Sequence, residues 1–294
     1  MKVVYGHTDS IYVQIDSVEL AQSAIKEIEE SVREHFPNVM GLDEHPVVLE
    51  FEKYYSALGV GTTKNRNAGM ITWNDGDWLD EPKFTMTGFT AKRVSETPFA
   101  KEIQTNALKK WVNQEPLERM NASLHAIYSS CLRKEIPIAS LVKRSRIKSA
   151  RFTVKCVECN KKHNLHDCLE LKWCERCGTE TKKFVTLQNK RPSIGSGIAG
   201  VIYAKQKLNA NFDDTYLYLK VKIDDTFINP LTKEQKPVEY ISGTTYEDFN
   251  DYEPDWEHYA QQVLKKAEPI YRAMNWDLSS IRTGKIQKKL DEWF

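Results

Sequence analysis

Two pairs of cysteines constrain the fold of this chain more than any other part of its sequence. Cys156 and Cys159 form one CxxC pair, and Cys174 and Cys177 form a second pair that Gly178 follows. Tetrahedral Zn²⁺ takes four thiolates, and each tight CxxC turn presents two of them. The spacing predicts a zinc ribbon over residues 152–184. Its Zn²⁺ is expected to be structural, because four cysteine ligands leave no coordination position open for catalysis.

Other residues of this segment leave alternatives open. Cys168, His163 and His166 lie between the two pairs and could replace a ligand. Free buried cysteines are the alternative to a metal site. Of the six cysteines, Cys131 is expected to be a core residue that lies on a helix. Paired spacing in an intracellular chain favours metal over disulfides, because intracellular thiols stay reduced.

Composition sets the size and the charge of the molecule. A chain of 294 residues, 40% hydrophobic and 28% charged, can bury a core in two domains plus a small module. The net charge is +1, from 42 basic and 41 acidic residues, so any nucleic-acid contact must come from local basic patches. The sequence has neither an apolar run of about 18 residues nor a signal segment, so we expect no membrane contact and a cytoplasmic location.

The first residues predict a β-hairpin. Residues 2–5 and 11–15 are rich in β-branched and aromatic side chains, and a polar turn that contains Gly6 joins them. Asp9 is then exposed at the turn. A carboxylate there suits two-metal phosphoryl transfer, in which divalent ions bridge the attacking hydroxyl and a nucleotide triphosphate. An ordinary polar turn is the alternative, because Thr, Asp and Ser are common turn residues.

The next segments predict a small antiparallel sheet with one long helix over residues 1–95. Ser17 is a plausible N-cap for a helix that runs to about residue 35. A strand-like run over residues 47–55 then places Glu50 and Glu52 on one face, because side chains of a strand alternate. A second strand pair follows it.

The rest of the chain is rich in helical patterns. Helices are expected from Pro98 to about Trp111, over residues 116–133 and over residues 255–274. Spaced glycines at residues 195–200 lack the Lys-Ser/Thr of a phosphate-binding loop and precede a strand-like run. The last of the three helices is amphipathic, and its expected core side consists of Tyr259, Val263, Leu264, Ala267, Ile270 and Tyr271.

In this order the segments resemble the C-terminal part of a family B DNA polymerase. Residues 5–10 look like the third conserved palm motif of that family, usually YGDTDS, and residues 49–55 look like its later palm strand with an acidic pair. Residues 63–69 are similar to the KKRYAG segment that reads the minor groove. The resemblance implies an α+β fold: a partial polymerase palm, made of an antiparallel sheet plus a helix, and a mainly helical thumb with an inserted zinc ribbon.

The resemblance also implies a domain order and a catalytic site. The C-terminal half of the palm would cover residues 1–95 and the thumb residues 96–283. Asp9 matches the family's ligand for the catalytic Mg²⁺ ions, and Glu52 matches an acid near the metals. His7 stands where the family usually has its first Asp, which changes the expected activity and metal preference.

Several basic residues are expected to contact DNA. Lys64 and Arg66 keep the positive charges of the minor-groove segment, whereas the neighbouring asparagines depart from the family pattern. Further cations lie at the passage from palm to thumb and before the ribbon, where they could hold duplex phosphates. A solvated charged face is the alternative. These cations are Lys92, Arg93, Lys143, Arg144 and Arg146.

Parts of a complete polymerase are missing from the expected organisation. The family's other catalytic Asp, its nucleotide-binding helix and its exonuclease precede the third palm motif. We therefore expect a separate large subunit to supply them and to pair with the open edge of the first strand. The interpretation is the small subunit of a split, archaeal-type replicative polymerase that acts on primer-template DNA and deoxynucleoside triphosphates. The alternative is a non-catalytic scaffold that binds DNA and a sliding clamp.

Residues 284–294 match the sliding-clamp interaction box, Gln-x-x-aliphatic-x-x-aromatic-aromatic. Its residues are Gln287, Leu290, Trp293 and Phe294. One helical turn would cluster the three apolar side chains into a plug for a pocket on the clamp. A last helical turn packed on the thumb is the alternative.

Overall fold

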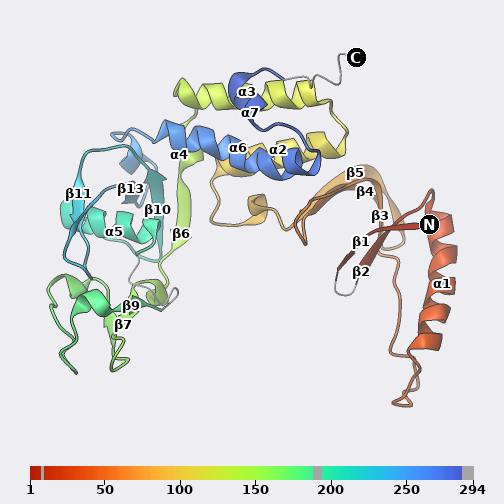
Figure 1. The fold of residues 1–294 in the computed structure, drawn as a ribbon, viewed down its shortest axis with the longest axis horizontal. Coiled ribbons are helices and arrows are strands. Elements are labelled where there is room, and N and C mark those ends of the chain that lie inside the picture. Colours follow the sequence, from red (N-terminus) through yellow and green to blue (C-terminus); the bar gives the residue numbers. More distant parts are fainter. Residues whose placement is uncertain (8–9, 188–193, 287–294) are drawn as a thin grey trace. The chain divides into compact units, whose positions relative to one another are not determined.

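The computed structural model describes residues 1–7, 10–187 and 194–286 (Figure 1). The chain forms two compact units. The first unit comprises residues 1–89, 105–120 and 268–277, and the second comprises residues 90–104, 121–267 and those from Leu278 onward. Among the described residues, no helix has the length and apolar character that crossing a bilayer requires.

The first unit begins with the predicted hairpin. β1 (Lys2–His7) and β2 (Ser10–Gln14) pair antiparallel in a two-stranded sheet, with Tyr5 opposite Tyr12. The hairpin prediction is confirmed. Asp9, which precedes β2 in the sequence, lies outside the described residues, as does the side chain of His7.

The predicted long helix is also present. α1 (Val18–His35) begins at the N-cap Ser17, whose hydroxyl accepts a hydrogen bond from the Leu20 amide at 3.2 Å. This contact satisfies one of the amides that a helix N-terminus leaves unpaired.

The strand expected from residue 47 begins later, so this prediction was partly wrong. Residues 47–52 form no strand, and Glu50 and Glu52 share no strand face. The backbone here pairs with side chains of α1 instead: Arg33 Nε donates to the Val47 carbonyl at 2.9 Å, and the Leu49 amide donates to Glu29 Oε2 at 2.9 Å. These hydrogen bonds occupy backbone N–H and C=O groups that a strand would use to pair with a neighbouring strand.

A three-stranded antiparallel sheet follows. β3 (Lys53–Val60), β4 (Asn67–Asn74) and β5 (Asp77–Thr87) lie side by side in the order β3-β4-β5 (Figure 1). Trp73 is buried, and its ring stacks on Phe51 at 4.5 Å. Trp111 of α2 packs on Gly59, where an added Cβ would lie only 2.6 Å from the indole ring.

The helices expected after residue 95 are confirmed. α2 (Pro98–Val112), α3 (Leu117–Leu132) and α6 (Trp256–Ala273) match the three predictions, and all six residues of the expected core side of α6 are buried. Two short helices, α4 (Ile138–Leu141) and α7 (Ser279–Thr283), accompany them. Single 3₁₀ turns lie at Thr90–Lys92, Ser149–Arg151, Asp167–Leu169, Thr181–Lys183 and Glu247–Phe249.

Small antiparallel sheets share this part of the chain, which was expected to be mainly helical. One has the order β13-β10-β6, one pairs β11 with β12, and the third has the order β8-β7-β9, with β7 and β8 in the ribbon and β9 directly after it. The second unit is therefore mixed α/β. Its strands are β6 (Lys143–Arg146), β7 (Thr153–Lys155), β8 (Lys162–Asn164), β9 (Val185–Thr186), β10 (Thr215–Lys220), β11 (Thr226–Ile228), β12 (Gln235–Pro237) and β13 (Tyr240–Gly243).

One segment expected as a strand is a helix. The run over residues 201–204 lies inside α5 (Ser196–Lys207). Its glycines have a packing role: a Cβ on Gly200 would lie 2.6 Å from Ser242 Oγ, and one on Gly197 would lie 2.9 Å from the Tyr216 hydroxyl. The glycines therefore let α5 approach β13 and β10 closely.

Candidate metal centre and nucleic-acid interface

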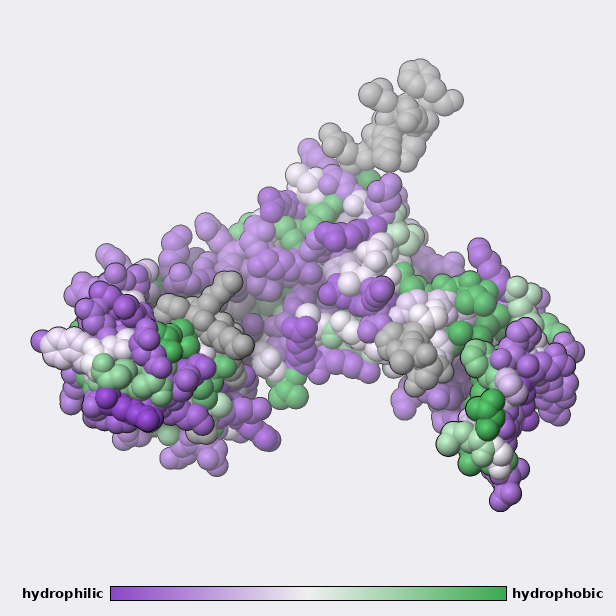
Figure 2. Space-filling model, turned by 60° about the horizontal axis from the view of Figure 1, so that its bottom comes forward, coloured by the Kyte–Doolittle hydropathy of each residue, from purple (hydrophilic) through white to green (hydrophobic). Residues whose placement is uncertain are grey.

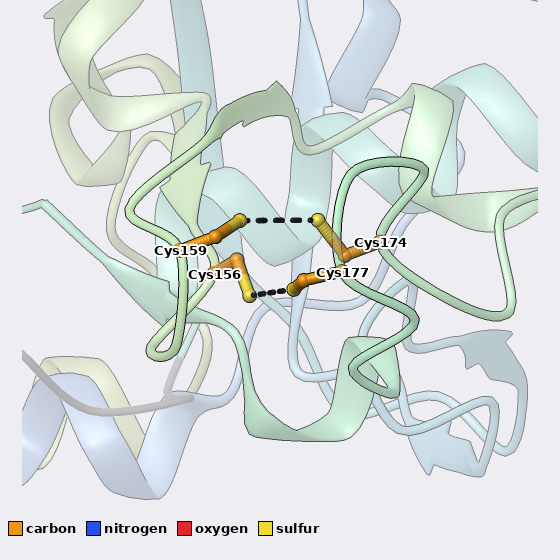
Figure 3. Close-up of side chains that lie close together, drawn as sticks. All are labelled: Cys156, Cys159, Cys174 and Cys177. Atoms are coloured by element: carbon orange, nitrogen blue, oxygen red, sulfur yellow. Dashed lines mark hydrogen bonds between the residues drawn. The ribbon is translucent and has the colours of Figure 1, made fainter.

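The four cysteines of the two CxxC pairs converge on one point. Their Sγ atoms all lie within 4.8 Å of one another. The Sγ atoms of Cys156 and Cys177 are 3.5 Å apart, as are those of Cys159 and Cys174 (Figure 3). Four sulfurs at about 2.3 Å from one zinc would be about 3.8 Å apart, whereas a disulfide needs about 2.0 Å. The arrangement therefore fits a tetrahedral metal and no disulfide.

Two tight turns present these sulfurs. In the first turn the Asn160 amide donates to the Cys156 carbonyl at 3.1 Å, and Asn160 has a φ of 57°. In the second, the Gly178 amide donates to the Cys174 carbonyl at 2.8 Å, and Gly178 has a φ of 73°. The left-handed conformation explains why a glycine follows the second pair, because glycine has no Cβ and adopts this conformation without steric cost.

Local hydrogen bonds lower the pKa values of the cysteine thiols, whereas burial and, at Cys159, the neighbouring sulfurs raise them. The Thr179 hydroxyl, 3.1 Å from Cys177 Sγ, lowers the pKa of Cys177 to about 6. At Cys159 a backbone hydrogen bond from Lys161 favours the thiolate, but burial and the three other sulfurs raise its pKa to about 12. Four thiolates repel one another without a cation, and a bound divalent ion removes that conflict.

The alternative ligands take other roles. His163 Nε2 lies 3.5 Å from Cys174 Sγ, and its ring stacks on Phe184 at 4.8 Å, so it contacts a ligand from outside the cluster. Burial lowers the pKa of His166 to about 4 and raises the pKa of the Cys168 thiol to about 11. Neither residue belongs to the four-cysteine cluster.

Glu52 directly precedes β3. The Tyr54 hydroxyl donates to the carbonyls of Ile15 and Asp16 at 3.3 and 3.2 Å, which places the start of β3 beside the end of β2. Glu52 itself is exposed and pairs with Lys53 at 2.9 Å.

The predicted minor-groove segment forms the turn between β3 and β4, and it contacts the hairpin. The Asn65 amide donates to the Tyr5 hydroxyl at 2.9 Å, and that hydroxyl donates to Asn65 Oδ1 at 3.2 Å. Lys64 is exposed and Arg66 is half-buried. Sequence reasoning missed the link between Tyr5 and Asn65, because Asn65 was seen only as a departure from the family pattern.

The predicted DNA-binding cations of the second unit differ in accessibility. Arg144 and Arg146 of β6 are exposed, as are Lys92 and Arg93. Lys143 is less available, because its Nζ lies 3.5 Å from a carboxylate oxygen of Glu96 and its side chain is 34% exposed. The second unit therefore carries exposed cations on the 3₁₀ turn that precedes α2 and on β6.

The proposed clamp-binding residues Gln287, Leu290, Trp293 and Phe294 lie outside the described residues. The preceding helix α7 is anchored: Ser280 Oγ donates to Asn121 Oδ1 of α3 at 2.7 Å. Gly284 ends α7 in the left-handed conformation, with a φ of 68°.

The chain thus combines a mixed α/β fold with four cysteines placed to hold a metal ion and with exposed cations. The sequence model of DNA polymerase family B matches residues 1–274. The chain belongs to DNA polymerase family B, so the resemblance found in the sequence is confirmed. A search of curated proteins finds no match.

Membership fixes the general chemistry. The matched region is a DNA polymerase domain, a nucleotidyltransferase whose substrates are DNA and deoxynucleoside triphosphates. Family B polymerases use divalent metals, and the four-cysteine cluster is compatible with Zn²⁺.

Proposed function

We propose that the chain is the small subunit of a split, archaeal-type family B DNA polymerase, and that it acts only together with a large subunit. Residues 1–95 would form the C-terminal half of the palm, residues 96–283 the thumb with its ribbon, and residues 284–294 a tail for the sliding clamp. The large subunit would supply the fingers, the exonuclease and the rest of the palm.

The open hairpin sheet is the observation that carries this proposal. Within the described residues β1 pairs with β2 alone, which leaves an edge of unpaired backbone groups. Apolar side chains of the hairpin and of α1 face solvent: Val3 is 62% exposed, Ile11 58% and Leu20 52%. Figure 2 shows hydrophobic side chains exposed on the first unit, which contains the hairpin and α1. An open edge and exposed apolar residues fit a partner that completes the sheet.

Asp9 is the proposed ligand for catalytic Mg²⁺, at the turn between β1 and β2. When bound, the metal supplies charge stabilisation for the transferred phosphoryl group and activates the primer hydroxyl. The residues of this chain would position the duplex. Lys64 and Arg66 would contact the minor groove, and the Tyr5–Asn65 hydrogen bonds would hold that turn against the hairpin.

The catalytic part is tested by primer extension. The chain is co-purified with its large subunit, and wild type is compared with Asp9→Ala in Mg²⁺. Asp16→Ala is the matched control, because Asp16 is an exposed carboxylate at the opposite end of β2. We expect Asp9→Ala to slow extension about 100-fold or more and Asp16→Ala to leave it unchanged. Primer extension that survives Asp9→Ala would contradict the catalytic role of Asp9. Failure to form a complex with any large subunit would contradict the proposal of a split polymerase.

The tail makes a separate claim. Trp293→Ala with Phe294→Ala should leave synthesis on short templates intact and abolish stimulation by the clamp. Lys288→Ala is the matched control, because Lys288 occupies one of the positions of the box at which the motif requires no particular residue. Stimulation that persists in the double variant contradicts the clamp proposal.

A second function is favoured by His7, which stands where the family usually has an Asp. With this replacement, the chain would serve as a DNA-binding, clamp-tethering scaffold without catalysis. The same extension assay separates the two functions. A stable complex that binds primer-template and clamp but extends no primer supports the scaffold.

A further inference from the structure

A groove on the zinc ribbon is lined by residues that the polymerase function does not use. It lies in the second unit, beside the second cysteine pair. Its lining includes Asp167, Glu170, Leu171, Lys172, Trp173 and Glu175. The groove is thus part apolar and part acidic.

Trp173 gives the groove its largest apolar surface. Its side chain is 55% exposed, and it directly precedes Cys174 of the metal cluster. Its backbone forms a β-bridge with Glu180. A large aromatic side chain on a backbone fixed in this way can anchor a partner at low entropic cost.

The charges of the groove disfavour nucleic acid. The lining contains three carboxylates against one lysine. Lys161 pairs with Glu175 at 2.5 Å and offsets one of the carboxylates, whereas Asp167 and Glu170 are exposed. His166 adds no positive charge at neutral pH, because burial lowers its pKa to about 4. Lys233 offsets a further charge, because its Nζ reaches the carbonyl of Leu169. A phosphate backbone would still meet the exposed carboxylates of Asp167 and Glu170 here, in contrast to the exposed arginines of β6.

The walls of the groove are held in place from outside the ribbon. Lys233, in the turn between β11 and β12, donates from Nζ to the carbonyls of Leu169 and Pro230 at 3.0 and 2.8 Å, and also to that of Cys168. The Thr181 hydroxyl donates to the Leu231 carbonyl at 3.0 Å. The groove therefore exists before any partner binds, which reduces the ordering cost of binding.

We propose that this groove binds a basic segment of a partner protein, in which lysines or arginines flank an apolar side chain. The apolar side chain packs on Trp173 and Leu171, and the flanking cations face Asp167 and Glu170. Charge complementarity selects a basic peptide and disfavours both DNA and acidic peptides. The proposal is independent of the split-subunit function, because no residue of the groove belongs to the palm or the tail.

The test uses two labelled peptides and the full-length chain. One peptide places two central leucines between lysines, and the other replaces each lysine with glutamate. Fluorescence anisotropy at low salt should show saturable binding of the lysine peptide and binding at least tenfold weaker for the glutamate peptide. Since the chain carries a net charge of only +1, its overall charge does not produce this preference.

Variants assign the binding to the groove. Trp173→Ala and Glu170→Lys should each weaken binding of the lysine peptide about tenfold or more. Trp78→Ala is the matched control, because Trp78 is 60% exposed on β5 of the first unit, and it should bind as wild type does. Metal content equal to that of wild type verifies that each variant keeps its ribbon. If Trp173→Ala lost its metal, the Glu170→Lys variant alone would test the groove, because the side chain of Glu170 is exposed and its substitution should leave the ribbon folded.

Three results would overturn the proposal. The first is no binding of the lysine peptide, and the second is equal binding by wild type and Glu170→Lys. The third is displacement of the peptide by duplex DNA in wild type together with loss of DNA binding in Trp173→Ala, which would assign the groove to nucleic acid.

Discussion

A buried ion pair in the second unit gives the sharpest test of the packing. Lys266 of α6 donates from Nζ to Glu96 Oε2 at 2.6 Å and to the Thr90 hydroxyl at 2.8 Å. The side chains of Lys266 and Glu96 are only 7% and 13% exposed. Lys143 Nζ lies 3.5 Å from the other carboxylate oxygen of Glu96. One carboxylate thus joins α6 and β6 to the turn that precedes α2.

The substitution Lys266→Met removes one partner and leaves the other buried. Breaking such a pair costs about 3–5 kcal/mol, and the remaining Lys143 compensates part of this, so we expect a loss of about 2–3 kcal/mol in the free energy of unfolding. Arg272→Met is the matched control. It breaks the exposed pair with Glu268, also near the end of α6, and should cost less than about 0.5 kcal/mol. Adding Glu96→Gln to Lys266→Met should recover much of the loss.

The effect should depend on pH in one direction. Burial alone would raise the pKa of Glu96, but the Lys266 hydrogen bond and the charges of Lys143 and Lys266 outweigh it, so the pKa is lowered. A carboxyl with a lowered folded pKa stabilises the fold above its unfolded value of about 4.3, and that stabilisation is lost as the pH falls through the folded pKa. The difference between wild type and Lys266→Met should therefore shrink below about pH 4.

The assay is urea unfolding at pH 7 and at low pH, followed by tryptophan fluorescence, with hydrogen exchange of α6 as a local readout. Two outcomes refute the reasoning. Lys266→Met could cost no more than Arg272→Met at pH 7, or its cost could be the same at both pH values.

Three further predictions follow from single contacts. Cys156→Ser should abolish binding of about one zinc per chain, measured by metal analysis, whereas Cys168→Ser should retain it; equal zinc in both would reject the ligand set. Ser17→Ala should destabilise α1 by about 1 kcal/mol, measured as faster hydrogen exchange of its amides. Ser23→Ala, in the middle of the helix, should leave the exchange unchanged, and equal effects of the two substitutions would exclude the role of Ser17 as the N-cap. Gly59→Ala should lower stability by about 1–3 kcal/mol in urea, because its Cβ meets an indole ring, and a neutral effect would contradict that packing.

Much of the fold was predictable where local signals agree. A capping serine starts α1, proline at the first position starts α2, and the apolar period of α6 matches the face that the structure buries. The metal ligands were predictable because Cys156 and its three partners lie in turns that are local in sequence. Each helix start and each CxxC turn is determined by residues within a few positions of one another, whereas the meeting of the two turns is a tertiary contact.

Predictions failed where tertiary contacts decide the local conformation. The central residues 200–204 of α5 are buried on all sides, so this part of the helix lacks an amphipathic period, and Val201 to Ala204 resemble a buried strand. Residues 47–52 have strand-like composition, but side chains of α1 take their backbone hydrogen bonds. The contact between Tyr5 and Asn65 joins residues far apart in sequence, and no local pattern encodes it.

The placement of Glu52 gives the last prediction. Two-metal catalysis needs carboxylates that reach ions about 4 Å apart. Glu52 is exposed and pairs with Lys53 at 2.9 Å. In the proposed enzyme, the second carboxylate of the site is then more readily supplied by the partner than by Glu52. Glu52→Gln should therefore slow primer extension less than about tenfold, in contrast to Asp9→Ala. A loss at Glu52 as large as that at Asp9 would contradict this prediction.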